Sequence, residues 1–290
     1  MQHIPVLADQ VLKWLAIRPS GIYVDATFGA GGHSRGILSR LRGGRLIALD
    51  ADPSAAERAA SIADPSFTFV HANFRTLSTV LETLAIESVD GVLYDLGVSS
   101  MQFEQASRGF SFREAGPLDM RMNPLAGRSA YDVLMSASET ELAEIFFDYG
   151  GERSARKIAR AIVHRRKGGV FPTTTLEFAQ MVSGMMHRRG RRERIHPATR
   201  IFQALRIAVN DELEALKESL DAAADRLRTA GRVVAISFHS LEDRIVKQKF
   251  RDDARLEALT RKPIVPADDE LERNPRARSA KLRAAEKKAS

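Results

Sequence analysis

The chain has 290 residues, of which 44% are hydrophobic and 28% are charged, as is ordinary for a soluble globular protein. It contains no cysteine, which excludes disulfide bonds, thiolate metal sites and cysteine nucleophiles. The seven histidines lack paired ligand spacing, so no metal site is expected. No apolar run approaches the roughly 20 residues that span a bilayer, and no signal-peptide pattern opens the chain, so we expect a cytoplasmic protein without a membrane partner.

The net charge of +7 is unevenly distributed along the chain. Residues 151–200 contain 13 Arg or Lys and 3 Glu, so this segment carries +10 and the rest of the chain −3. A polyanionic partner explains such an asymmetry better than general solubility does.

The first hundred residues alternate between strand and helix patterns. An amphipathic helix containing Val11 and Leu15 comes first, and Pro19–Gly21 breaks it. Strands are predicted over 22–25, 46–50, 67–70 and 89–95, with helices over 34–41, from Pro53 to about Ile62, and around 80–84. This alternation predicts an α/β fold with a doubly wound, mostly parallel, Rossmann-like sheet.

The alternation stops after Asp95 and resumes with a predicted strand over 233–238. The intervening segment begins with a Gly-, Ser-, Pro- and Met-rich stretch and continues with helical spacing over 139–149, 155–166 and 175–186. A single long helix is then expected from Pro197 past Leu220, ended by Gly231. We therefore expect a helical domain (109–212) inserted into a sheet domain (1–108 and 213–290).

The glycine-rich turn after the first strand predicts a nucleotide-like ligand. Glycines let a backbone approach a ligand closely, but Asp25 at the mouth of the turn would repel a pyrophosphate. S-adenosylmethionine carries no phosphate and has a net positive charge, so it tolerates this carboxylate. The turn therefore favours a methyl donor, with NAD or a purely structural turn as the alternatives.

Three strand ends supply further candidate residues. Asp50 suits a bidentate contact with ribose hydroxyls, although it could cap the next helix, a role for which Asp52 competes. Phe74 could stack on adenine, or belong to the core. Asp95 could accept the N–H bonds of an exocyclic base amine and so aim its lone pair at a methyl group.

Other candidates are ambiguous. Phe238 and His239 could line a target pocket, while Ser240 with Asp243 fits the start of a helix. The tract 187–194 could contact RNA phosphates or be a solvated charge run, and Phe110 and Phe112 could act as wedges between bases or simply pack. The candidate phosphate contacts in this tract are Arg188, Arg189, Arg191 and Arg192.

Taken together, these residues resemble the MraW, or RsmH, family of 16S ribosomal RNA cytosine-N4 methyltransferases. The matching segments run in order along nearly the whole chain: Asp25–Ser34, Asp95–Ser100, Arg108–Phe112, Gly116–Met122, His196–Arg200, Ile236–Lys247 and Asn274–Arg278. The resemblance implies methyl transfer from S-adenosylmethionine to N4 of a cytosine in the decoding region, at the P site of the small ribosomal subunit. It also implies donor contacts at Gly31, Gly32, His33, Asp50, Phe74, Asp95 and Gln102.

The lack of cysteine agrees with transfer to an exocyclic nitrogen, which is a direct displacement and needs no covalent nucleophile. Two alternatives are an NAD-dependent oxidoreductase and a non-catalytic RNA-binding module that keeps the sheet as scaffold. The sequence leaves open whether the protein forms a homodimer.

Overall fold

The computed structural model describes residues 5–186 and 196–289. The chain divides into two compact units, Met1–Gly97 with Leu213–Ser290, and Val98–Glu212. Residues 98–108, which the sequence analysis placed in the sheet domain, group with the second unit. None of the helices in the described ranges is long and apolar enough to cross a membrane.

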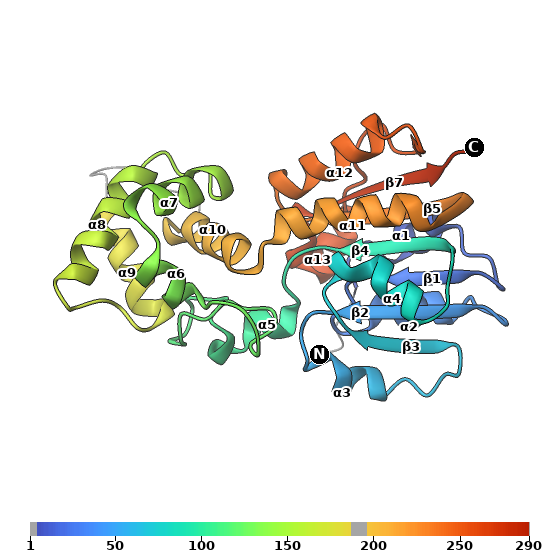
Figure 1. Cartoon of the computed structure of the whole chain (residues 1–290), viewed down its shortest axis with the longest axis horizontal. Coiled ribbons are helices and arrows are strands. Elements are labelled where there is room, and N and C mark those ends of the chain that lie inside the picture. The colour runs from blue at the N-terminus through green and yellow to red at the C-terminus, as the bar shows by residue number, and fades with distance from the viewer. Residues whose placement is uncertain (1–4, 187–195, 290) are drawn as a thin grey trace. The chain divides into compact units, whose positions relative to one another are not determined.

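The first unit is built on a seven-stranded sheet with the strand order β3-β2-β1-β4-β5-β7-β6 (Figure 1). Strands β1 to β5 are parallel, and β7 runs antiparallel to both of its neighbours. The predicted α/β class with a doubly wound, mostly parallel sheet is confirmed. The strands are β1 (Ile22–Asp25), β2 (Arg45–Asp50), β3 (Phe67–His71), β4 (Val89–Asp95), β5 (Leu227–Ser237), β6 (Leu256–Ala258) and β7 (Lys281–Lys287).

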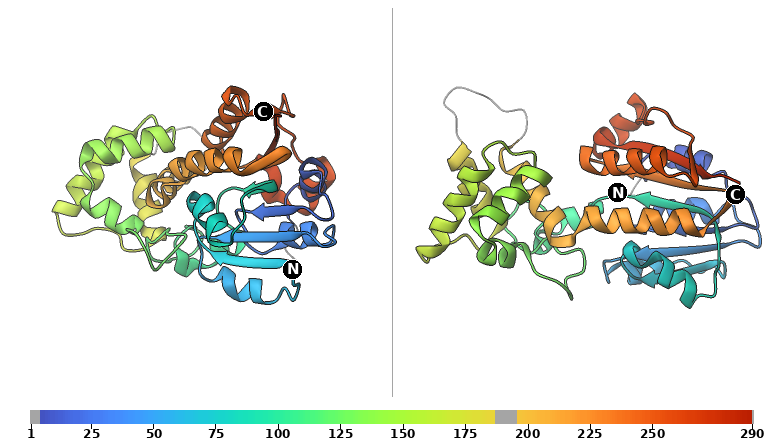
Figure 2. Two further views of the ribbon diagram at one scale, coloured as in Figure 1. Left: turned by 45° about the vertical axis from the view of Figure 1, so that its right-hand side comes forward. Right: turned by 45° about the horizontal axis from the view of Figure 1, so that its top comes forward.

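Helices cover both faces of this sheet (Figures 1 and 2). Successive side chains of a strand point to opposite faces, so Tyr94 packs with the helices α4, α11 and α12, whereas Leu93 packs with α1 and α2. Both side chains are fully buried. The helices of this unit are α1 (Ala8–Leu15), α2 (Gly32–Leu38), α3 (Ala55–Ala60), η1 (Phe74–Thr76), α4 (Leu77–Thr83), α11 (Glu212–Arg226), α12 (Ser240–Asp252), α13 (Asp268–Arg273) and η4 (Pro275–Ser279).

The C-terminal part of the sheet contains strands that the sequence analysis did not predict. Strand β7 carries Arg283 in its middle, and this side chain is only 6% exposed. Its guanidinium Nε lies 2.7 Å from Oδ1 of Asp243 on α12, so an ion pair compensates the buried charge. Strand β5 begins at Leu227, six residues before the expected start.

The second unit is helical and has its own hydrophobic core, in which Phe146, Ile158 and Phe178 are fully buried. Three of its helices begin with a capping box. In each, the N-cap serine side chain accepts from the backbone N–H three residues later, and the side chain of that later residue accepts from the serine N–H. The unit contains α5 (Ser100–Glu104), η2 (Ala106–Arg108), α6 (Ala130–Ser136), α7 (Glu139–Glu144), the π-helix η3 (Ile145–Tyr149), α8 (Ala155–Lys167), α9 (Thr175–Met186) and α10 (Ala198–Asn210).

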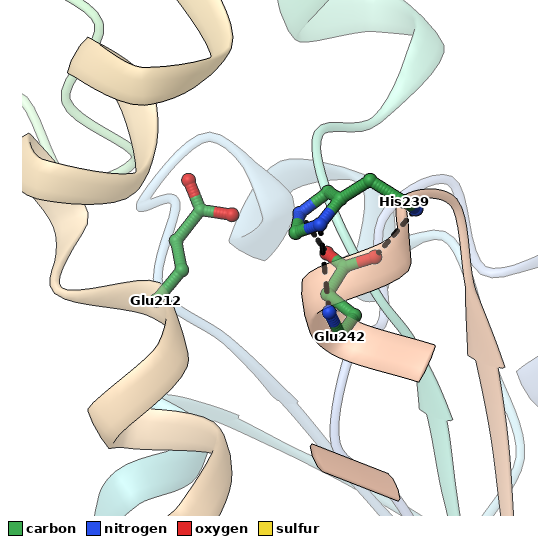
Figure 3. Close-up of side chains that lie close together, drawn as sticks. All are labelled: Glu212, His239 and Glu242. Carbon is green, nitrogen blue, oxygen red and sulfur yellow. Dashed lines mark hydrogen bonds and ion pairs between the residues drawn. The ribbon is translucent and has the colours of Figure 1, made fainter. Parts of the chain in front are cut away.

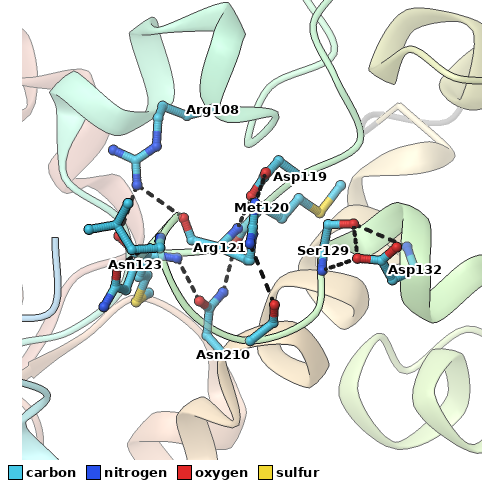
Figure 4. Close-up of polar contacts among 11 residues, drawn as sticks. Arg108, Asp119, Met120, Arg121, Asn123, Ser129, Asp132 and Asn210 are labelled. Atoms are coloured by element: carbon cyan, nitrogen blue, oxygen red, sulfur yellow. Dashed lines mark hydrogen bonds and ion pairs between the residues drawn. The ribbon is translucent and has the colours of Figure 1, made fainter.

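The long helix expected from Pro197 past Leu220 is in fact two helices, α10 and α11. They meet at Asp211, which adopts a left-handed conformation with φ of 48°. The break follows from contacts of Asn210: its amide donates to the carbonyl of Met120 at 2.8 Å and accepts from Met122 N–H at 2.7 Å (Figure 4). Arg108 donates to the carbonyl of Met122 at 2.9 Å, so the loop that contacts the end of α10 is also held by η2.

Candidate active site

Three carboxylates lie at one edge of the sheet. Asp25, Asp50 and Asp95 are the last residues of β1, β2 and β4, and these strands are neighbours in the order β2-β1-β4. Ligands of doubly wound sheets bind at this carboxyl edge. The structure therefore brings together the strand-end residues that the sequence analysis singled out.

The glycine turn between β1 and α2 is built for close backbone packing. Gly31 has φ of 76° and precedes α2, and a Cβ at this position would lie 2.8 Å from the ring of Phe28. A Cβ on Gly32 would lie 3.1 Å from the ring of Pro5, which packs over the turn. A side chain at Gly31 would collide with Phe28 and strain the backbone, and one at Gly32 would press against Pro5.

The Asp25 carboxylate accepts hydrogen bonds from this turn and from helix α2. Its Oδ2 accepts a hydrogen bond from Ser34 Oγ at 2.7 Å, and its Oδ1 accepts from Thr27 N–H at 3.1 Å. The side chain is 1% exposed, and burial raises the pKa of its carboxyl above the usual value. The sequence analysis did not anticipate these contacts of Ser34 and Thr27. Thr27 Oγ1 also accepts from the backbone N–H of Asp95 at 2.6 Å.

Asp50 bridges the turn and the segment after β2. One carboxylate oxygen accepts from Gly29 N–H at 2.7 Å and the other from Asp52 N–H at 2.8 Å. Each oxygen retains a second lone pair that a ribose hydroxyl could use. Asp52 does not cap the helix either: its Oδ1 accepts from Ser54 N–H at 3.0 Å, but the N-cap residue of α3 is Ser54, and no side chain caps this helix. The helix-cap alternative for Asp50 is therefore not what the structure shows.

His33 and Asp95 present polar atoms that have no hydrogen-bond partner among the described residues. His33 Nε2 lies 3.6 Å from Asp95 Oδ2, longer than a hydrogen bond, and both His33 Nε2 and Asp95 Oδ1 are buried. Burial opposes protonation of His33, but the carboxylates of Asp95 and Asp25 outweigh it and hold the pKa of the imidazole above its usual value. Buried polar atoms without partners are uncommon in native proteins, and they mark this place as one where a ligand could bind.

Phe74 lies at the start of η1 and is held by buried groups. Its ring meets the ring of Tyr94 edge-on, with centroids 5.9 Å apart. Ser219 on α11 donates from Oγ to the carbonyl of Phe74 at 2.8 Å, and Tyr94 Oη lies 2.7 Å from the same Oγ. Ser219 was not anticipated, because 145 residues separate it from Phe74.

The N-terminal segment is fixed over the glycine turn from the far end of the chain. Leu7, which has φ of 53°, donates its N–H to Oε1 of Glu270 on α13 at 2.7 Å, across 263 residues of sequence. The negative charge of Glu270 also contributes to the raised pKa of His33. No sequence pattern pointed to Glu270.

His239 and Glu242 start α12 together (Figure 3). Glu242 Oε2 accepts from the N–H groups of Phe238 and His239 at 2.8 and 3.2 Å, and the His239 ring accepts from Glu242 N–H at 3.4 Å. The N-cap residue is therefore His239 and not Ser240 as expected. Phe238 is partly buried against the face that carries α1 and α2.

The remaining candidates belong to the second unit. Gln102 is 6% exposed, and its Oε1 accepts from Ser99 N–H at 2.9 Å in a capping box. Phe110 is 5% exposed in the core, and Phe112 packs between His196 and Phe202, so both contacts favour the packing alternative over wedges. The four arginines Arg188, Arg189, Arg191 and Arg192 lie outside the described residues.

A family model and two relatives each match nearly the whole chain. The model of the MraW methylase family matches residues 1–288. A ribosomal RNA small subunit methyltransferase H from Nitrosomonas eutropha is 49% identical over 98% of this chain and 97% of its own length, and one from Carboxydothermus hydrogenoformans is 47% identical with the same coverage. Among solved structures, an rRNA methylase from Streptococcus thermophilus is 12% identical, with a TM-score of 0.47 over 99% of each chain.

Proposed function

Because this chain belongs to the MraW methylase family, we propose that it transfers a methyl group from S-adenosylmethionine to N4 of a cytosine in the decoding region of 16S ribosomal RNA. The names of its relatives support a ribosomal RNA substrate in the small subunit. The observation that carries the proposal is that two buried polar atoms beside the glycine turn, His33 Nε2 and Asp95 Oδ1, have no hydrogen-bond partner among the described residues.

The residues at the carboxyl edge fit S-adenosylmethionine. Asp50 offers lone pairs to ribose hydroxyls, Phe74 offers an aromatic ring for adenine, and the turn at Gly31 and Gly32 allows close backbone approach. Asp95 offers a carboxylate to the positively charged part of the donor, beside His33. Gln102, from the second unit, is assigned a donor contact through the family resemblance.

The bound donor supplies a methyl group activated by a sulfonium. The chain's task is to make a poor nucleophile react, since the lone pair of an exocyclic amine is delocalised into the base. We assign this task to Asp95, whose carboxylate accepts N–H bonds of the amine and turns its lone pair toward the methyl group. The position of Asp95 is fixed by its backbone bond to Thr27, so the effect comes from a preorganised acceptor.

The helical second unit is proposed to bind the RNA, with the sheet unit holding the target base. A cytosine amine within a stacked helix could not reach the donor, so the base must be unpaired or flipped out. Phe238 and His239 at the end of β5 are candidate contacts of the flipped base. The tract with Arg188, Arg189, Arg191 and Arg192 remains a candidate contact of the phosphates.

The test is methyl transfer onto small ribosomal subunits from cells that lack the protein. Isotope-labelled S-adenosylmethionine is used, and mass spectrometry of the digested RNA locates the label. Wild-type protein should label one cytosine at N4. Asp95→Ala should reduce the single-turnover rate at saturating donor and RNA far more than it reduces RNA affinity.

Donor affinity is measured for the same variant, because Asp95 could also contact the donor. An Asp95→Ala rate equal to the wild-type rate would remove Asp95 from catalysis. Label on another base or at C5 would refute the proposed reaction. Calorimetric binding of NADH in place of S-adenosylmethionine would favour the oxidoreductase alternative.

A further inference from the structure

Among the cations of helix α8, only Arg160 has an acidic partner within the described residues. The 13 residues of α8 include six Arg or Lys and no Asp or Glu. Arg156, Arg165 and Lys167 are exposed and have no side-chain hydrogen bond or ion pair with any residue in the described ranges. Arg160, with a side chain that is 78% exposed, lies 3.3 Å from a carboxylate oxygen of Glu139, an exposed pair that contributes little stability.

Several cations near the end of α12 are instead neutralised by nearby carboxylates. Lys249 contacts Asp253 at 2.7 Å, and Arg255 contacts the same carboxylate at 2.6 Å. Arg255 also pairs with Asp225, and Arg251 with Asp252 at 2.6 Å. Unpaired exposed cations occur elsewhere too, but α8 gathers several of them on one helix that contains no acidic residue.

The cations of α8 form a stripe opposite its buried face. At about 100° per residue, Arg156, Arg160 and Lys167 fall within an arc of about 40°, and they extend over about 16 Å along the helix axis. Ile158 and Ile162, on the other side, are fully buried in the core of the second unit. The stripe thus faces away from the packing contacts that hold the helix.

The helix dipole favours the cations at only one end of this stripe. Cations in the last turn, such as Lys167, interact favourably with the helix dipole. Arg156 lies in the first turn, where the dipole disfavours a cation and where no acidic residue compensates it. The charge at that end therefore costs stability in the free protein, and a bound anion would offset this cost.

We propose that the stripe formed by Arg156, Arg160 and Lys167 binds phosphates of the RNA substrate. This inference rests on the proposed function for the identity of the polyanion. Two of the three residues are arginines, whose planar guanidinium can bind a phosphate through two hydrogen bonds. A membrane surface fits less well, because a helix lying on lipid needs an exposed apolar face and α8 buries its own.

The test measures binding of the full-length protein to a decoding-region transcript of 16S ribosomal RNA between 50 and 200 mM salt. The variant is the triple Arg156→Gln, Arg160→Gln, Lys167→Gln, which keeps the buried face of α8 intact. If all three residues contact phosphates, the log–log salt slope should fall by about 2–3. Wild-type affinity should then decrease about 15- to 40-fold more than that of the variant across this range of salt.

A matched control removes the same charge elsewhere. Arg40, Arg45 and Lys288 belong to the first unit, are exposed, and have no side-chain partner within the described part of the chain. The corresponding triple Gln variant should bind RNA with the wild-type slope. Equal losses in both variants would reduce the effect to net charge and overturn the inference.

Further outcomes separate this inference from the proposed function. A wild-type slope in the α8 variant overturns the inference and leaves the methyltransferase proposal intact. A third outcome is that RNA binding is salt-dependent and weaker in the α8 variant, while the wild type transfers no methyl group. This outcome overturns the proposed reaction and supports the α8 surface. Binding to phosphatidylserine vesicles that only the α8 variant loses, with RNA binding unchanged, assigns the stripe to a membrane instead.

Discussion

The hydroxyls of Tyr94 and Ser219 form a hydrogen-bonded chain that ends at the Phe74 carbonyl. Substitutions in this chain should change stability and donor binding to different extents. Tyr94 and Ser219 are fully buried, and the Ser219 hydroxyl donates to the carbonyl of Phe74. Ser219→Ala removes this donor while the carbonyl keeps its bond from Leu77 N–H, so the variant should lose about 0.5–1.5 kcal/mol of stability. For a unit of this size, each kcal/mol corresponds to about 2–4 °C in Tm.

Donor affinity should fall as well, because the ring of Phe74 is no longer anchored beside Tyr94. An aromatic contact contributes about 0.5–1.5 kcal/mol, so the Kd for S-adenosylmethionine should rise by about 2- to 12-fold. Thermal unfolding and calorimetric titration measure the two effects on the same protein.

Tyr94→Phe is the control variant. It keeps the edge-on ring contact with Phe74 and leaves Ser219 free to donate to the Phe74 carbonyl. It should therefore lower Tm while the Kd stays unchanged, and the double variant should be non-additive because the two hydroxyls share one chain. An unchanged Kd in Ser219→Ala, or an equal rise in Tyr94→Phe, would refute the anchoring role.

Three further predictions concern other parts of the sheet unit. Asp50→Ala should weaken S-adenosylmethionine binding by about 1–3 kcal/mol in calorimetry, and an unchanged Kd would remove Asp50 from the ribose role. Glu270→Ala should speed hydrogen exchange of the Leu7 amide and weaken donor binding, because the acceptor of the Leu7 N–H is lost. Glu270→Gln keeps an acceptor oxygen and should restore much of both, and equal behaviour of the two variants would contradict the role assigned to this hydrogen bond. Hydrogen bonds from Arg255 hold the pKa of Asp253 far below its usual range. The ionised carboxylate of Asp253 therefore stabilises the fold above the pKa that it has in the unfolded chain, and this stabilisation is lost in acid. Asp253→Asn should lower Tm at pH 7, by an amount that shrinks below about pH 4.

The sequence predicts the parallel core well where a strand is an apolar run with clear ends, although the start of β5 is missed by six residues. Strand β4 matches its expected bounds, 89–95, and β1 does so as well. The convergence of Asp25, Asp50 and Asp95 follows from the same reasoning, since the ends of neighbouring parallel strands meet at one edge.

Features that depend on distant partners could not be predicted in this way. Strand β7 contains a central arginine that is tolerated only because Asp243 pairs with it. The apolar stripe of α10 and α11 is continuous in sequence, and the break at Asp211 depends on the contacts that Asn210 makes 88 and 90 residues away. Ser219 and Glu270 were missed for the same reason, because neither belongs to a local motif.

The position of β7 has a consequence for synthesis of the protein on the ribosome. This strand lies between β5 and β6, so β6 has no partner in the sheet until residues 281–287 have emerged from the exit tunnel. The Leu7–Glu270 bond over the glycine turn likewise waits for α13. The helical second unit ends at residue 212, so all of its residues are made before α13 and β7, whereas the donor edge and the sheet can be completed only after these later elements have been synthesised.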